Sequence, residues 1–161
     1  MLENMVTDRT LAHYLRWKEL RDKGWANMTE AEREEWWNGV SVKKGSYGYT
    51  DLNRVGAALN YLRERLAVAG YLTGAEFSAR ENWGVEDVPT ADDLTYYLSS
   101  VATIRGALAT LSTTPAMPPD VCSLDYLGAN AIEQILVDVD QLVTNMLAVR
   151  YFCGDLYSGE V

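Results

Sequence analysis

The sequence of 161 residues is poor in the residue types that build most catalytic and metal centres. It holds a single histidine, His13, and only two cysteines, Cys122 and Cys153, which lie far apart. A structural zinc site needs about four His or Cys ligands at close motif spacing, and a Ser or Cys nucleophile needs an adjacent base. Neither arrangement occurs, and we expect His13 to be a solvated or hydrogen-bonded structural residue. The sequence therefore predicts no catalytic residue, no metal site, no cofactor and no enzymatic activity.

Long apolar runs and an excess of basic residues are also missing. No charge-free run approaches the roughly 18 apolar residues of a membrane span, and the first ten residues lack the basic and apolar regions of a secretory signal. With 14 Lys and Arg against 23 Asp and Glu, the net charge is −9. A nucleic-acid binder needs clustered basic residues to displace counterions. We therefore expect no membrane span and no nucleic-acid partner.

The two cysteines are predicted to stay reduced. They flank a predicted helix of about 26 residues, whose ends lie about 39 Å apart at a rise of about 1.5 Å per residue. A disulfide needs Cα atoms within about 7 Å. Reduced thiols are compatible with synthesis in a cytoplasm.

What the sequence does contain is a repeated helical pattern. Three segments place apolar residues at alternating spacings of three and four, which is typical of helices that bury one face. We predict helices over about 51–69, 91–111 and 124–149, with Thr50, Thr90 and Ser123 near their starts. The apolar positions are, in turn, Leu52, Val55, Leu59, Leu62, Leu66 and Ala69; Leu94, Tyr97, Val101, Ile104, Leu108 and Leu111; and Ile132, Ile135, Val139, Leu142, Met146 and Val149.

Shorter helices are predicted within residues 7–38. One begins at Thr7 or Asp8 and ends at Gly24, and the second begins at Thr29, which starts a capping-box pattern. The Asn-Gly pair that follows is also the strongest short hairpin signal. Because the preceding EAEREE is poor strand material, we favour a helix end at this pair.

Together these segments predict an all-α fold, an antiparallel helical bundle of three long helices with the N-terminal helices, in one domain over residues 1–161. An isolated helix cannot bury its apolar face, so the three long faces are expected to close on one another. Residues 71–89 and 112–120 would connect the long helices. We expect 71–89 to pack across one end of the bundle, and we allow a short strand within it.

Aromatic residues are the candidate functional feature. Five Trp and ten Tyr are present, and several lie outside the helical stripes. Such residues are typical of protein–protein hot spots and of surfaces that stack on carbohydrate, and they also cover the ends of bundles. We name Trp36, Trp37, Tyr47, Tyr49 and Trp83 as candidate binding residues. We expect Tyr49 to anchor the start of the first long helix and Tyr47 to face outward.

Several segments resemble a helical domain of tail-associated structural proteins from phages and prophages of Gram-positive (Firmicutes) bacteria. They are TDRT, KGWANMTEAEREEWW, KGSYGYTDLNRVGAALNYLRERL, ENWGVEDVPTADDLTYYLSSVATIRGAL, IEQILVDVDQL and YSGEV. The likeness covers nearly the whole chain, and YTDLNRV is its most specific piece. The chain departs from it at Gly48, where a second Asn is expected, and carries Gly56 inside the helix. We expect both glycines to loosen this junction.

The resemblance implies a virion component near a tail tip, baseplate or fibre, made in the host bacterial cytoplasm. Its partners would be other virion proteins and further copies of itself. We therefore expect a non-enzymatic structural or attachment module that acts through protein–protein assembly. Two alternatives stay open: aromatic-mediated recognition of a host-surface glycan, and a small acidic phage inhibitor of a host protein, for which the net charge is the motive.

Overall fold

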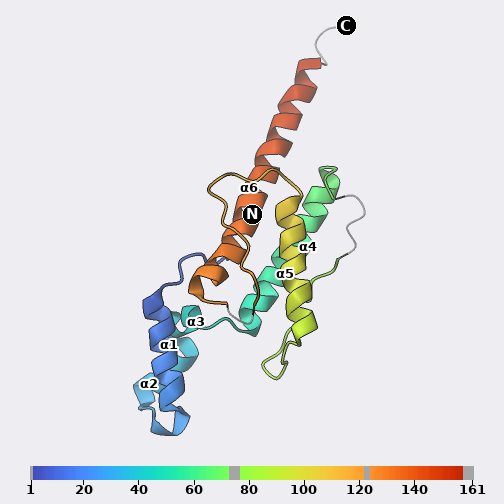
Figure 1. Ribbon diagram of the computed structural model, residues 1–161. Coiled ribbons are helices and arrows are strands. Elements are labelled where there is room, and N and C mark those ends of the chain that lie inside the picture. Colours follow the sequence, from blue (N-terminus) through green and yellow to red (C-terminus); the bar gives the residue numbers. More distant parts are fainter. Residues whose placement is uncertain (1, 73–76, 122–123, 158–161) are drawn as a thin grey trace.

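The structure is all-helical, which confirms the predicted fold class (Figure 1). It is a computed structural model that describes residues 2–72, 77–121 and 124–157. Its helices are, in order, α1 (Leu11–Lys23), α2 (Glu30–Asn38), α3 (Val40–Gly45), α4 (Tyr49–Val68), α5 (Ala91–Gly106) and α6 (Tyr126–Tyr157), with a 3-10 turn at Trp25–Asn27. The short strand allowed within 71–89 is not found in the described part of that segment, residues 71–72 and 77–89.

Helix α1 is capped by Thr10, so the predicted start at Thr7 or Asp8 was too early. The Thr10 hydroxyl accepts from the His13 backbone N–H at 3.4 Å, and the His13 Nδ1 accepts from the Thr10 backbone N–H at 3.2 Å. His13 is thus hydrogen-bonded, which is one of the two states that we expected for it. The start moves because residues 2–9 are held against α6, as described below.

Helix α2 begins at the predicted capping box and ends at the Asn-Gly pair. The Thr29 hydroxyl accepts from the Glu32 N–H at 3.3 Å, and the Glu32 carboxylate accepts from the Thr29 N–H at 2.7 Å. After Gly39 the chain enters the short helix α3, which the sequence pattern did not predict. The Asn-Gly pair therefore ends a helix, as we predicted, and does not form the turn of a hairpin.

The capping carboxylate of Glu32 predicts a pH dependence of stability. Hydrogen bonds from the Lys23 ammonium (2.6 and 2.7 Å) and from Thr29 lower the pKa of Glu32 from 4.5 to about 2. A carboxyl whose pKa is lowered by folding stabilises the fold above its unfolded pKa, and this contribution is lost as the pH falls through the folded pKa. We expect Glu32→Gln to be less stable than the wild type at neutral pH. The difference should close between pH 4.5 and about 2 in urea unfolding curves.

The matched control is Glu34→Gln, an exposed position on the same helix. A stability difference for Glu32→Gln that stays constant from neutral pH down to about 2 would contradict this account of the cap.

Helices α1, α2 and α3 share a small core of their own at one end of the molecule (Figure 1). Leu20, Met28 and Val42 are buried in it, and Trp17 and Trp36 pack against it. At Gly45 a Cβ would lie 2.2 Å from the His13 carbonyl oxygen, so the glycine permits the close approach of α3 to α1.

The main core lies between α4, α5 and α6, which contact one another pairwise. The predicted stripe of α4 is buried from Leu52 to Leu66, and the helix ends before Gly70 as predicted. Gly70 has a φ of 89°, and the Tyr71 N–H bonds the Leu66 carbonyl at 2.9 Å, which is a glycine-type helix end. The antiparallel arrangement of the three helices stays a prediction.

Helix α5 is shorter than predicted, because it ends at Gly106 and not near 111. Thr90 caps its start as predicted, with Asp93 as the capping-box partner. Leu108 packs against the core from the turn after the helix, whereas Leu111 is exposed. Glycine is a poor helix former, and the helix ends at Gly106. The apolar spacing continues to Leu111, which is why the prediction was too long.

Helix α6 extends beyond the predicted end at 149, and its C-terminal half projects past the other helices (Figure 1). The predicted Ile132, Ile135 and Val139 are buried, but Val149 is exposed. Leu136 and Val143 are buried beside them, whereas Val149 lies in the projecting half, where no other described helix covers it. Ser123 and Cys122, for which a cap and a free thiol were predicted, lie outside the described residues.

The segment after α4 packs along that helix and not across an end of the bundle. The Asn60 side chain bonds the backbone N–H and C=O of Ala79 at 2.9 and 2.8 Å, and Asn53 bonds those of Trp83 at 2.6 and 2.9 Å. Between them, a Cβ on Gly56 would lie 2.2 Å from the Arg80 carbonyl oxygen. Gly56 therefore permits close packing, and the expectation that it loosens the junction was wrong.

Candidate functional site

A buried ionic network joins the N-terminal segment to α4 and α6. The Arg9 guanidinium lies 2.7 Å from both the Asp51 and the Glu133 carboxylates, and the Arg54 guanidinium reaches the same two groups at 2.5 and 2.7 Å. The side chains of Arg9, Asp51 and Glu133 are almost completely buried. Two cations and two carboxylates balance within the network, which is the condition for burying charge.

Residues 2–9 are held by polar side chains on one face of α6. The Leu2, Val6 and Arg9 backbone N–H groups donate to Asp140 (3.3 Å), Glu133 (2.6 Å) and Asn130 (3.0 Å) in turn. The Asn130 amide also donates to the Arg9 carbonyl oxygen at 2.9 Å. These contacts, which no sequence pattern revealed, fix one wall of the cavity described next.

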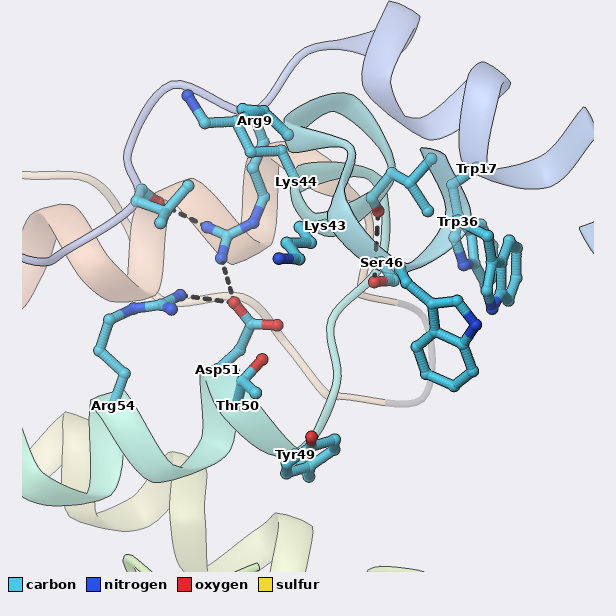
Figure 2. A pocket seen from close by; sticks show the side chains of 14 residues that line it. Arg9, Trp17, Trp36, Lys43, Lys44, Ser46, Tyr49, Thr50, Asp51 and Arg54 are labelled. Atoms are coloured by element: carbon cyan, nitrogen blue, oxygen red, sulfur yellow. Dashed lines mark hydrogen bonds and ion pairs between the residues drawn. The ribbon is translucent and has the colours of Figure 1, made fainter. Parts of the chain in front are cut away.

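A cavity of about 590 Å³ lies between the N-terminal helices and the start of α4. We call it the tryptophan pocket; it is lined by Val6, Arg9, Trp17, Trp36, Trp37, Val40, Val42, Lys43, Lys44, Ser46, Tyr49, Thr50, Asp51 and Arg54. Figure 2 shows Trp17 and Trp36 on one side of the pocket, Arg9, Lys43 and Asp51 on the other, and Tyr49 and Thr50 at the start of α4. Its volume is in the range of ligand and docking pockets, which combine apolar walls with a few polar groups.

The pocket is basic although the protein is acidic. Four cationic side chains line it, and two of them, Arg9 and Arg54, are committed to the ionic network. Lys44 lies 2.5 Å from the Asp8 carboxylate. Among the described residues, the exposed Lys43 ammonium has no ion-pair or hydrogen-bond partner. Lys43 is therefore the cation that remains available to a bound group.

Three of the five candidate binding residues come together at this pocket. Trp36, Trp37 and Tyr49 line it, with Trp37 62% and Tyr49 43% exposed. Trp36 is half-buried against the small core. The sequence pattern missed Trp17 and Lys43, because no spacing rule connects α1 and α3 to the start of α4.

The other two candidates, Tyr47 and Trp83, point into the protein. The Tyr47 hydroxyl lies 2.5 Å from the Tyr97 hydroxyl, and its ring packs against the main core with the Arg9 guanidinium 5.3 Å away. Burial raises the pKa of both phenols well above the ordinary value. Trp83 is 9% exposed and lies under the Arg80 guanidinium at 4.0 Å.

The predicted orientations of the two tyrosines were therefore wrong. Tyr47 packs inward because its hydroxyl finds a partner 50 residues away in sequence, and Tyr49, in the first turn of α4, is the exposed one. A partner so distant in sequence leaves no local signal.

Within the described residues, no cluster of three or more His, Cys, Asp or Glu side chains is placed to hold a metal ion. The same part of the chain contains no helix that is both long and apolar enough to cross a membrane. Comparisons of the chain with protein-family models, with curated proteins and with solved structures gave no match.

Proposed function

We propose that the protein is a non-enzymatic structural or attachment module of a phage virion, associated with the tail, baseplate or fibre, and that it acts through protein–protein assembly. It would be made in the cytoplasm of the host bacterium and reside in the virion. The resemblance of YTDLNRV and its neighbouring segments supports the setting. The observation that carries the proposal is the group of exposed apolar residues, Trp37, Val40 and Tyr49, at the tryptophan pocket, since such groups are typical of docking surfaces.

In this proposal α4, α5 and α6 form an antiparallel bundle that supports the pocket. The ionic network and the N-terminal segment fix the pocket walls before a partner arrives, which lowers the entropy lost on docking. The partners are other virion proteins and further copies of the chain.

A pull-down against the tail proteins encoded beside its gene tests the proposal, with wild type compared with Trp37→Ala. We expect the wild type to retain at least one tail protein and Trp37→Ala to retain about tenfold less, because exposed aromatic anchors contribute about 1–2 kcal/mol or more to docking. Tyr71→Ala is the matched control, since Tyr71 is an exposed aromatic residue just beyond the opposite end of α4. A strictly monomeric protein that binds no tail protein would count against the proposal.

Recognition of a host-surface glycan is a second candidate. The observation that favours it is the pair of exposed indoles Trp25 and Trp37, whose ring centroids lie 6.1 Å apart in an edge-to-face arrangement. Indole faces are what carbohydrate rings stack on. Binding of Trp25→Ala and wild type to host cells would test it, because equal binding by both would remove the role of this pair. An acidic inhibitor of a host protein stays a prediction that rests on net charge.

A further inference from the structure

We propose that the tryptophan pocket receives the loop 85–88 of a second copy of this chain, with Glu86 placed against Lys43. The inference rests on the proposed assembly function, because it names the partner of the same pocket. Three observations support it: Lys43 has no partner among the described pocket residues, the loop carries an exposed carboxylate between two exposed valines, and both features lie next to the start of α4.

The pocket offers Lys43 no free negative group, because Asp51, the carboxylate in its lining, already accepts from Arg9, Arg54 and the Gly48 N–H. Its exposed walls are apolar, chiefly Trp37 and Val40, and Lys43 has no partner among the described residues. A carboxylate flanked by aliphatic side chains would complement both features, since charge complementarity selects a partner and apolar contact supplies affinity.

The loop presents such a group. Val85 and Val88 are 71% and 85% exposed, and Glu86 between them is exposed, with no ion-pair or hydrogen-bond partner among the residues that the structure describes. The neighbouring Asp87 is committed instead, because its carboxylate accepts from Arg80 at 2.5 Å and from the Gly84 N–H at 2.8 Å.

The loop is also held in shape before it meets a partner. Besides the Asp87 contacts, the Asp87 N–H donates to the Gly84 carbonyl oxygen at 3.2 Å, and Asn53 fixes the backbone of Trp83. A preformed loop loses little conformational freedom on binding, so two exposed valines and one carboxylate can suffice for a specific contact.

Pocket and loop both adjoin the N-terminal half of α4. From this helix the pocket includes Tyr49, Thr50, Asp51 and Arg54, and Asn53 bonds the backbone of Trp83, two residues before the loop. The loop does not line the pocket of its own chain, so the contact requires another copy. A two-fold axis beside the start of α4 would place each loop in the other copy's pocket, which closes the assembly as a dimer.

Charge reversal tests this contact by sedimentation velocity over a range of protein concentrations, with no other virion protein present. We expect the wild type to dimerise as its concentration rises, and Lys43→Glu and Glu86→Lys each to weaken the dimer by about tenfold or more, because like charges then face each other. An equimolar mixture of the two variants should dimerise as the wild type does. In the mixed dimer each pocket again meets a loop of opposite charge.

The double variant, Lys43→Glu with Glu86→Lys, should also dimerise as the wild type does. Lys18→Glu and Glu64→Lys reverse exposed charges outside the pocket and serve as controls that leave the dimer unchanged. All variants change exposed side chains, and equal thermal unfolding midpoints would establish that they are folded.

The inference is overturned if the wild type stays monomeric at every concentration, if the single variants dimerise as the wild type does, or if neither the mixture nor the double variant regains the dimer. Each of these results leaves the tail-protein pull-down to decide the proposed function separately. A pull-down that fails while the charge-reversal pattern holds would reject the assembly with tail proteins and keep the dimer.

Discussion

Replacing Arg9 by methionine is expected to lower the free energy of unfolding by about 3–5 kcal/mol, which is the cost of leaving buried charge without its partner. Arg9 is 4% exposed and bridges Asp51 and Glu133 at 2.7 Å each. Arg54 reaches the same carboxylates, but one guanidinium cannot balance two carboxylates that lie in a water-excluded site. Chemical unfolding followed by circular dichroism measures the loss.

The matched control is Lys18→Met, which breaks an ion pair between exposed side chains on α1. We expect it to cost no more than about 0.5 kcal/mol, because exposed pairs within a helix contribute little. If Arg9→Met and Lys18→Met have the same effect, the network does not stabilise the fold in the manner described.

A double-mutant cycle that combines Arg9→Met with Glu133→Gln measures the interaction energy between these two side chains. Because Arg9 and Glu133 are in direct contact, we expect the double variant to lose less free energy of unfolding than the sum of the two single variants. The difference should be about 0.5–3 kcal/mol. The Val6 backbone N–H donates to the same Glu133 carboxylate, and the Arg9 backbone N–H donates to Asn130 one turn earlier on α6. Limited proteolysis should therefore cut residues 2–9 faster in Arg9→Met than in the wild type.

Replacing Gly56 by alanine is the second large effect that we expect, a loss of about 1–3 kcal/mol from overpacking. The added Cβ would lie 2.2 Å from the Arg80 carbonyl oxygen and 3.1 Å from its carbonyl carbon. Both are backbone atoms, and Asn53 and Asn60 clamp the backbone on either side of them. The segment cannot move aside without breaking those hydrogen bonds.

The same substitution at Gly106 provides a control with the opposite sign. Gly106 is the last residue of α5, and a Cβ there would meet no atom within 4 Å. Gly106→Ala should therefore stabilise the protein by about 0.4–1 kcal/mol, because alanine has fewer unfolded conformations to lose. Thermal and urea unfolding of the two variants would reject the packing argument if both shifted in the same direction.

The local signals in the sequence predicted five of the six helices in the described part of the chain and missed the short α3. The Thr29 capping box and the Thr90 cap form as predicted, and the apolar positions of α4 from Leu52 to Leu66 are buried. Such signals act within one turn or one face of a helix, so neighbouring residues determine them. The errors fall where a local pattern continues but the helix or its contacts do not, as at Leu111 and Val149.

The candidate site was predictable only in part, for a related reason. Residue type and loop position were enough to nominate Trp36, Trp37 and Tyr49, which line the tryptophan pocket. The same reasoning nominated Tyr47 and Trp83, which pack inward because Tyr97 bonds the Tyr47 hydroxyl and the main core receives the Trp83 ring. Whether an aromatic side chain faces solvent depends on the space and the partners around it, and local sequence does not encode either.

The sequence by itself determined the all-α fold, the caps that start α2 and α5, and the absence of familiar catalytic and metal motifs, because spacing and capping are properties of neighbouring residues. Only the tertiary structure decided that Arg9 contacts Glu133, that Gly56 allows a second backbone segment to approach, and that Lys43 lines the same pocket as three tryptophans. These features join residues from separate elements, and the free energy of burying them depends on packing that forms only when the whole chain folds.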